Sequence, residues 1–209
     1  FIYNFISITI MISIIWMGKK FSSKNKHRLT TGIASLFIFE FFFMDWYHVY
    51  TGVWSVQDSL PLHLCGIMWF VTIYMLLTKK QWAFEMMLFI GMPGGVHSLL
   101  TPELTHGDSL LHKIDFFIGH GGLVLAPFYA IYVLNMWPRK SAWWKSFIKL
   151  QILVLIAGLA NYVFESNYMY LAHPPIANNP LIPPGDSFFG QWPYYILIFE
   201  IAVLAHAVL

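Results

Sequence analysis

The stretch LLHKIDFFIGHGGLVLAPFYAIYVLNMW, residues Leu110–Trp137, decides the fold class of this chain. It is long and apolar enough to cross a lipid bilayer, because a transmembrane helix needs about 20 largely apolar residues. Its first third nevertheless carries His112, Lys113, Asp115 and His120. An ionisable side chain inside a membrane is costly unless it faces protein or water, so such residues are candidates for function. We interpret this segment as the wall of a polar pocket in a membrane protein.

The composition indicates the same class. Of the 209 residues, 58% are hydrophobic and only 11% are charged, whereas soluble domains contain about 25% charged residues. The single cysteine, Cys65, excludes an intrachain disulfide framework. We find no internal repeat, cleavable signal peptide or soluble second domain, so we expect one domain over residues 1–209. The chain begins without Met and ends within an apolar run, and we expect both ends to be incomplete.

Seven apolar segments predict an all-α fold with seven transmembrane helices. Ser59 and Pro61 are typical of a helix start, with the serine as N-cap and the proline just inside, and they predict the beginning of the third helix. Asp108 or Ser109 is expected to cap the fifth helix. The predicted spans are residues 1–17, 29–53, 59–77, 81–100, 110–137, 144–168 and 192 onward.

The basic residues predict the orientation of these spans. Because consecutive spans cross in opposite directions, the loops after the first, third and fifth spans share one face. Eleven of the twelve Lys and Arg residues lie there, within residues 19–28, 79–80 and 139–149, and Lys113 alone lies opposite. Positive charge stays in the cytoplasm, so we predict an outside N-terminus and a cytoplasmic C-terminus. We expect a multi-pass protein of the cell membrane, of the bacterial inner membrane type. Its expected partners are membrane lipids and no nucleic acid.

In this orientation, titratable side chains of five helices converge in the outer half of the membrane. Helix-stabilising hydrogen bonds would have no reason to prefer one half, so the convergence predicts a site. We predict that the catalytic residues are His63, His112, Asp115 and His120 and that the substrate-binding residues are Asp45, His48, Asn161 and Glu165.

The histidines suit proton transfer. His63 and His112 each lie near the start of a predicted helix, where the positive end of the helix dipole disfavours imidazolium. A neutral imidazole can act as a general base or bind a metal. Asp115 lies three residues after His112 and could orient a nearby imidazole. Zinc would need several of these ligands, but no His-Glu-x-x-His spacing supports it, so we predict no cofactor.

Several polar residues have a simpler interpretation. A single histidine in a membrane helix most often makes an interhelical hydrogen bond, and we favour this for His97 and His206. Glu85 is expected near Lys79 or Lys80 at the cytoplasmic edge. We expect Cys65 to be a small buried apolar side chain, since apolar surroundings disfavour the thiolate.

Four segments resemble the YwaF-like integral membrane proteins, a group that includes a eukaryotic transmembrane acyltransferase of ether phospholipids. The resemblance covers nearly the whole chain, and the Pro-x-His and His-Gly-Gly elements are its most specific parts. The segments are SLPLHLCG (Ser59–Gly66), HGGLVLAPFY (His120–Tyr129), NYMYLAHPP (Asn167–Pro175) and WPYY (Trp192–Tyr195).

The resemblance implies a seven-helix fold and acyl transfer between lipids. In the acyltransferase branch a cysteine stands between the Pro and His of the third-helix motif. Here Leu62 occupies that position, and Cys65 lies two residues beyond His63. The resemblance therefore carries over His63, and on this basis Cys65→Ser is expected to stay active.

Three functions remain open from the sequence. As an acyltransferase or lipid hydrolase, the protein would use His63 or His120 as base, and Cys65, Ser98 or a water as nucleophile; no Gly-x-Ser-x-Gly motif identifies the nucleophile. As a small-molecule binding or transport protein, it would use helices broken at prolines to line a path. As a structural membrane subunit, its polar groups would only join helices.

Overall fold

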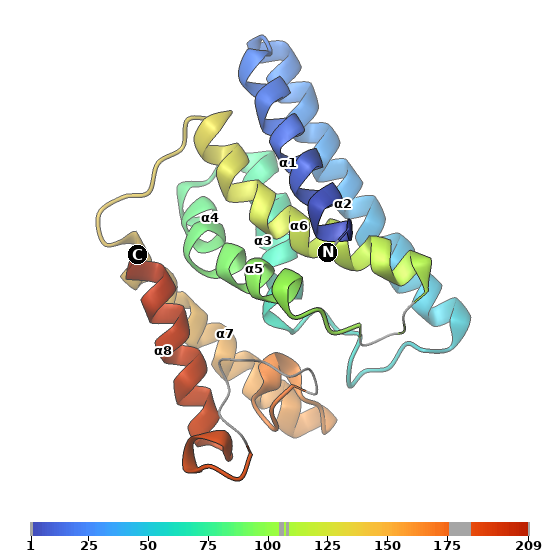
Figure 1. Cartoon of the computed structure of the whole chain (residues 1–209), viewed down its shortest axis with the longest axis vertical. Coiled ribbons are helices and arrows are strands. Elements are labelled where there is room, and N and C mark those ends of the chain that lie inside the picture. Colours follow the sequence, from blue (N-terminus) through green and yellow to red (C-terminus); the bar gives the residue numbers. More distant parts are fainter. Residues whose placement is uncertain (1, 105–106, 108, 176–184, 209) are drawn as a thin grey trace.

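The computed structural model describes residues 2–104, 107, 109–175 and 185–208, and these residues form helices joined by turns and loops (Figure 1). The all-α prediction is confirmed for this part of the chain. The helices are α1 (Ile2–Lys20), α2 (Ser23–Thr51), α3 (Leu64–Thr78), α4 (Gln81–Met86), the π-helix η1 (Met87–Gly91), α5 (Met92–Leu100), α6 (Leu110–Tyr132), α7 (Ala142–Phe164), the 3₁₀-helices η2 (Tyr168–Tyr170) and η3 (Phe188–Gly190), and α8 (Tyr194–Val208).

The helices have the length and composition of a polytopic membrane protein. Five described segments are long and apolar enough to span a bilayer: α1, α2, the continuous helix Gln81–Leu100, α6 and α7. The apolar helices α3 and α8 contain 15 residues each, fewer than the roughly 20 that a perpendicular span needs. The total of seven spans and their orientation stay predictions.

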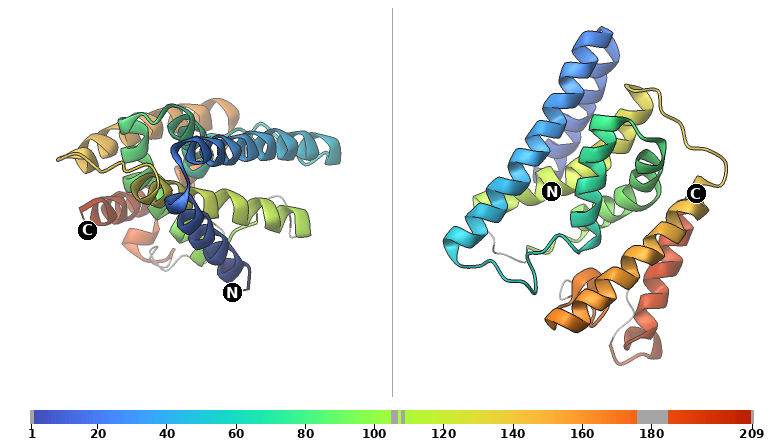
Figure 2. Two further views of the ribbon diagram at one scale, coloured as in Figure 1. Left: turned by 90° about the horizontal axis from the view of Figure 1, so that it is seen from above. Right: turned by 180° about the vertical axis from the view of Figure 1, so that it is seen from behind.

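Helix α6 lies at the centre of the arrangement. It contacts α1, α3 and α5, while α2 packs on α3. Helices α7 and α8 lie side by side, on the side of the molecule away from α1 and α2 (Figure 2). Helix α1 has one buried residue, Gly18. The exposed isoleucine and phenylalanine side chains of α1 are typical of a lipid-facing helix.

Glycines set the closest contacts at the centre. A Cβ atom on Gly95 of α5 would lie 2.9 Å from the backbone oxygen of His120 in α6. A Cβ on Gly122 would lie 2.6 Å from the Phe37 ring of α2. The Phe37 ring in turn stacks on Trp69 of α3, with ring centroids 4.3 Å apart. These small residues let helix backbones approach closely, as is usual between membrane helices.

The helix starts agree only in part with the sequence prediction. Ser109 caps α6, because its side chain accepts a hydrogen bond from the His112 backbone N–H; the alternative cap, Asp108, lies outside the described residues. The predicted start of the third helix at Ser59 and Pro61 is wrong, since α3 begins at Leu64. The Ser59 hydroxyl instead accepts a hydrogen bond from the Ser55 backbone N–H at 3.1 Å and stabilises a turn.

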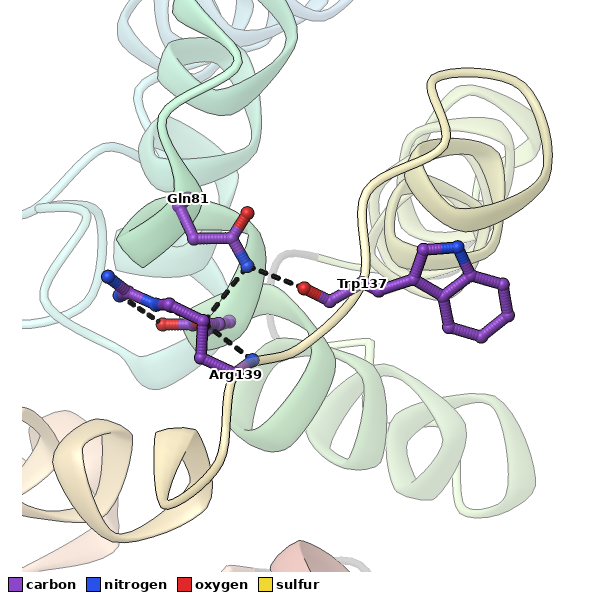
Figure 3. Close-up of polar contacts among 4 residues, drawn as sticks. Gln81, Trp137 and Arg139 are labelled. Atoms are coloured by element: carbon purple, nitrogen blue, oxygen red, sulfur yellow. Dashed lines mark hydrogen bonds and ion pairs between the residues drawn. The ribbon is translucent and has the colours of Figure 1, made fainter.

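A clamp ties the start of α4 to the connection between α6 and α7 (Figure 3). The Glu85 carboxylate accepts hydrogen bonds from the Arg139 guanidinium, and the Gln81 side chain donates to both Glu85 and the Trp137 carbonyl oxygen. The sequence placed Glu85 near Lys79 or Lys80, and the structure adds an ion-pair partner that the sequence did not predict, Arg139 from the chain between α6 and α7.

Candidate functional site

A cavity of about 530 Å³ opens between the helices, within the range of about 300–1,000 Å³ that small-molecule sites occupy. Residues of α2, α3, η1, α5, α6, α7 and α8 line it, together with the connections after α2, α5 and α7. Apolar side chains such as Trp69, Ile90 and Leu123 form much of its wall. Its polar lining includes Glu40, Asp45, His48, Asp58, His63, Cys65, His97, Ser98, Glu103, His112, Asp115, His120, Tyr170, Glu200 and His206.

Six of the eight predicted site residues therefore lie around one cavity: His63, His112, Asp115, His120, Asp45 and His48. The other two, Asn161 and Glu165, are not among the lining residues. The structure places this set together but assigns none of its members a role.

Asn161 and Glu165 shape the end of α7 instead. The Asn161 side-chain oxygen accepts hydrogen bonds from the Tyr168 backbone N–H at 2.7 Å and the Ser166 hydroxyl at 2.9 Å. Glu165 is exposed and adopts the left-handed conformation, with φ 53°, that ends the helix. Because α7 ends at Phe164 and neither side chain lines the cavity, we leave both residues out of the candidate site.

The closest chemical pairing in the wall joins α3 to α6. The Cys65 thiol and the His120 imidazole lie close enough to interact electrostatically, and the Cys65 sulfur lies 3.8 Å from the Ser98 hydroxyl of α5. A thiol beside an imidazole has the arrangement in which a base activates a nucleophile. The expectation that Cys65 is only an apolar side chain did not anticipate these contacts.

The other ring nitrogen of His120 fixes its tautomer. His120 Nδ1 lies 2.9 Å from the Phe116 carbonyl oxygen. Since a carbonyl oxygen only accepts hydrogen bonds, Nδ1 must carry the proton. In the neutral imidazole Nε2 is then the acceptor, and it is the nitrogen left to take the proton of the Cys65 thiol.

Local sequence explains why these two side chains meet. The turn before α3 lies over Gly66, where a Cβ atom would come within 3.1–3.3 Å of Pro61 backbone atoms. That contact fixes the first turn of α3, which carries Cys65. The close approach at Gly95 places the backbone of α6 at His120 directly against α5. The predicted Pro-x-His and His-Gly-Gly elements thus flank the pairing.

Two acidic side chains, Asp115 and Glu40, lie near the Cys65–His120 pair. The Asp115 carboxyl group hydrogen-bonds Glu40 of α2 and acts electrostatically on His120. A hydrogen bond between two carboxyl groups requires one proton between them. Asp115 was expected to orient a nearby imidazole, and the structure puts it within the electrostatic reach of His120, with Glu40 as a partner that the sequence prediction did not include.

His63 contacts the backbone of the segment after α7 through a hydrogen bond from Met169. It is the N-cap residue of α3, and its Nδ1 accepts a hydrogen bond from the Met169 N–H at 3.3 Å. Its ring packs against Tyr168 and Tyr170, with centroids 5.2 and 5.5 Å away. Because Nδ1 of His63 already accepts a backbone N–H, only its other ring nitrogen could act as a base, and the catalytic role of His63 stays a prediction.

The remaining histidines form two ring pairs. His48 and His112 stack with centroids 5.5 Å apart and an interplanar angle of 18°. His97 and His206 meet edge to face at 5.0 Å. The predicted interhelical hydrogen bond of these two is wrong among the described residues, because His206 Nδ1 pairs with its own helix at Ala202 and His97 Nε2 has no hydrogen-bond partner.

Within the described part of the chain, no group of three or more His, Cys, Asp and Glu side chains is placed to hold a metal ion. The two imidazole pairs each offer two ligands, and structural zinc takes four.

Sequence reasoning also missed other polar residues of the wall, among them Tyr170 and Glu103. Tyr170 and Glu103 lie in the connections after α7 and α5, and neither is part of a catalytic motif that the sequence analysis identified. The only signal was the position of Tyr170 inside the NYMYL segment that follows α7.

Comparisons with known proteins show to which family the chain belongs. No curated protein and no solved structure matches the chain. One family model matches residues 1–209, all of the chain, and its family consists of transmembrane proteins. This membrane protein, with its Cys65–His120 pairing in the wall of a helix-lined cavity, therefore belongs to the TMEM164 family.

Proposed function

We propose that this protein transfers acyl groups between membrane lipids in the outer half of the bilayer, with Cys65 as nucleophile and His120 as its base. The observation that carries the proposal is the placement of the Cys65 thiol beside the His120 imidazole in the wall of one cavity, where the two groups interact electrostatically. It agrees with the acyl transfer implied by the resemblance to the ether-phospholipid acyltransferase. It makes Cys65 the nucleophile, and so replaces the sequence-based expectation that Cys65→Ser stays active.

In the first half-reaction, the Cys65 sulfur attacks the carbonyl carbon of a lipid ester while His120 Nε2 takes the thiol proton. The ester C–O bond breaks, and His120 gives the proton to the departing lipid alcohol. The acyl group remains on sulfur as a thioester.

The second half-reaction reverses these proton transfers. The hydroxyl group of a second lipid gives its proton to His120, and its oxygen attacks the thioester carbonyl. The C–S bond breaks, and His120 returns the proton to the Cys65 sulfur. Water in place of the lipid hydroxyl would release a fatty acid, which is the hydrolytic version of the same chemistry.

The cavity suits a lipid. Its wall combines apolar side chains from several helices with a few polar groups gathered around Cys65 and His120, which is the usual composition of a small-molecule site. Acyl chains can lie against the apolar wall while the ester reaches the polar part.

The test is a search for the acyl-enzyme. Purified protein in lipid nanodiscs receives a phospholipid with an isotope-labelled acyl chain, and intact mass spectrometry measures the mass added to the protein. We expect one acyl group, mapped to Cys65 and released by hydroxylamine, and none on Cys65→Ala. His120→Ala should slow its formation by about 10²–10⁴-fold, the usual contribution of a general base.

Ser98→Ala is the matched control, because the Ser98 hydroxyl is the other candidate nucleophile and lies beside the Cys65 sulfur. It should still form the adduct. An adduct that maps to Ser98, or lipid products formed by Cys65→Ala at the wild-type rate, would contradict the proposal.

A further inference from the structure

The connection after α7 returns across the start of α3. We call residues Ser166–Ala172 the strap. Met169 and Tyr170 within it have φ values of 55° and 54°. Residues other than glycine rarely adopt this left-handed conformation, and they keep it where surrounding contacts hold the backbone in place.

Three elements supply those contacts. Asn161 of α7 accepts a hydrogen bond from the Tyr168 N–H at 2.7 Å. Tyr195 of α8, whose side chain is fully buried, donates its O–H to the Tyr170 carbonyl oxygen at 2.6 Å. The strap is thus fixed at its start by α7 and near its middle by α8.

The third contact comes from α3. His63 accepts the Met169 N–H, and His63 stands only two residues before Cys65. This places the middle of the strap at the end of α3 that carries the thiol. That end of α3 joins the connection from α2.

The strap presents large side chains to the cavity. Met169, Tyr170 and Leu171 all line it. Burial raises the pKa of the Tyr170 phenol above its ordinary value, and the negative charge of Glu103 raises it further. The phenol therefore remains neutral and hydrogen-bonded to Glu103. On this side of the cavity the strap therefore presents large side chains, and the contacts with α3, α7 and α8 hold its backbone in one position.

We propose that His63 is a positioning residue: by holding the strap over Cys65 it keeps water from the acyl thioester, so that a lipid hydroxyl rather than water receives the acyl group. This inference rests on the proposed acyl transfer for its chemistry. The position of the strap can be tested without it.

The experiment compares His63→Ala with His63→Asn. An asparagine side-chain oxygen can accept the Met169 N–H in place of His63 Nδ1, and alanine cannot. The first measurement is the rate at which a charged, water-soluble methanethiosulfonate reagent modifies Cys65, the only cysteine, in the absence of added lipid. Loss of one hydrogen bond should raise this rate by about two- to tenfold in His63→Ala, and His63→Asn should restore the wild-type rate.

The second measurement is the partition of the acyl group. With a labelled phospholipid donor and a lysophospholipid acceptor, His63→Ala should release about two- to tenfold more fatty acid per transferred chain, a ratio that does not depend on how fast the acyl-enzyme forms. Tyr195→Phe loosens the strap from α8 and leaves α3 unchanged, so it should act in the same direction. His27→Ala, an exposed histidine of α2, is the control and should change neither measurement.

Thiol modification of His63→Ala and Tyr195→Phe at the wild-type rate would overturn the inference. So would increased modification with an unchanged ratio of hydrolysis to transfer. If the wild-type protein forms no acyl-enzyme while His63→Ala still exposes Cys65 and His63→Asn protects it, the strap is upheld and the proposed function fails.

Discussion

The Glu85 carboxylate is held by the Arg139 guanidinium through two hydrogen bonds, 2.8 Å from Nε and 2.7 Å from Nη2, although the residues are 54 positions apart. The Arg139 backbone N–H donates a third to the same carboxylate at 3.1 Å. Glu85 is only 1% exposed, while the Arg139 side chain is 58% exposed. Because the carboxylate is buried and the guanidinium is largely solvated, the clamp depends more on Glu85 than on Arg139.

We predict that Glu85→Gln lowers the free energy of unfolding by about 1–3 kcal/mol, since it weakens several hydrogen bonds to a charged group. The measurement is unfolding in detergent micelles, followed by circular dichroism. Glu165→Gln is the matched control: this carboxylate is exposed at the end of α7, and surface changes of this kind usually stay within about 0.5 kcal/mol. Equal effects of the two variants would show that the clamp contributes nothing.

The glycine pair of α5 gives a second prediction. Gly95→Ala should destabilise the protein by about 1–3 kcal/mol, the usual cost of overpacking, because its Cβ would lie 2.9 Å from the His120 backbone oxygen. Gly94→Ala should not, because its Cβ would meet the Leu64 side chain at 3.6 Å and the Cys65 sulfur at 3.9 Å, which are ordinary contacts. In a helix, alanine also gains about 1 kcal/mol over glycine, so Gly94→Ala is expected to be neutral or stabilising.

The measurement is again unfolding in micelles, with thiol modification of Cys65 as a second readout. If Gly95→Ala moves α6, it should alter the modification rate of Cys65 through His120. A Gly95→Ala protein as stable as Gly94→Ala would mean that α5 and α6 separate at no cost.

The apolar helices and the polar lining of one cavity could be predicted from sequence, because both follow from where ionisable residues interrupt apolar segments. Asp115 and His120 are costly inside a membrane helix, and that cost alone marks them. The partner of each group could not be predicted this way. Contacts such as those between Cys65 and His120, or Glu85 and Arg139, join residues 54 or 55 positions apart, and they depend on how helices cross.

The start of α3 shows a second reason for error. Ser59 and Pro61 have the residue types of a helix start, but local preference is weak compared with tertiary contacts. Here the Tyr168 hydroxyl accepts a hydrogen bond from the Leu60 N–H at 3.2 Å and donates one to the Val56 carbonyl oxygen at 2.6 Å. A side chain more than 100 positions away in the sequence thus holds this segment as a turn.

The eleven-to-one distribution of basic residues gives a topology prediction. Figure 1 places the α1–α2 turn and the α3–α4 connection toward one end of the molecule, and the beginning of α8 toward the other. In a Cys65→Ser background, we expect Lys24→Cys to react only after the membrane is permeabilised and Asp186→Cys to react in intact cells. Reaction of both in intact cells would contradict the seven-span topology and the outer position of the site.

The hydrogen-bonded acids Glu40 and Asp115 allow a prediction about which of them assists His120. Asp115 acts electrostatically on the imidazole, so as a carboxylate it would stabilise the imidazolium that forms when Cys65 loses its proton. Glu40 would then be the member that donates a proton to the shared hydrogen bond.

Glutamine at position 40 offers an amide N–H in the same place, so Glu40→Gln should keep the wild-type rate of acyl-enzyme formation. Asp115→Asn removes the charge and should lower that rate by about 10–100-fold, as expected for losing 1.5–3 kcal/mol from an interaction with a charged group. Intact mass spectrometry of the acyl-enzyme over time measures both rates. The reverse order, with Glu40→Gln slow and Asp115→Asn fast, would assign the charge to Glu40 instead.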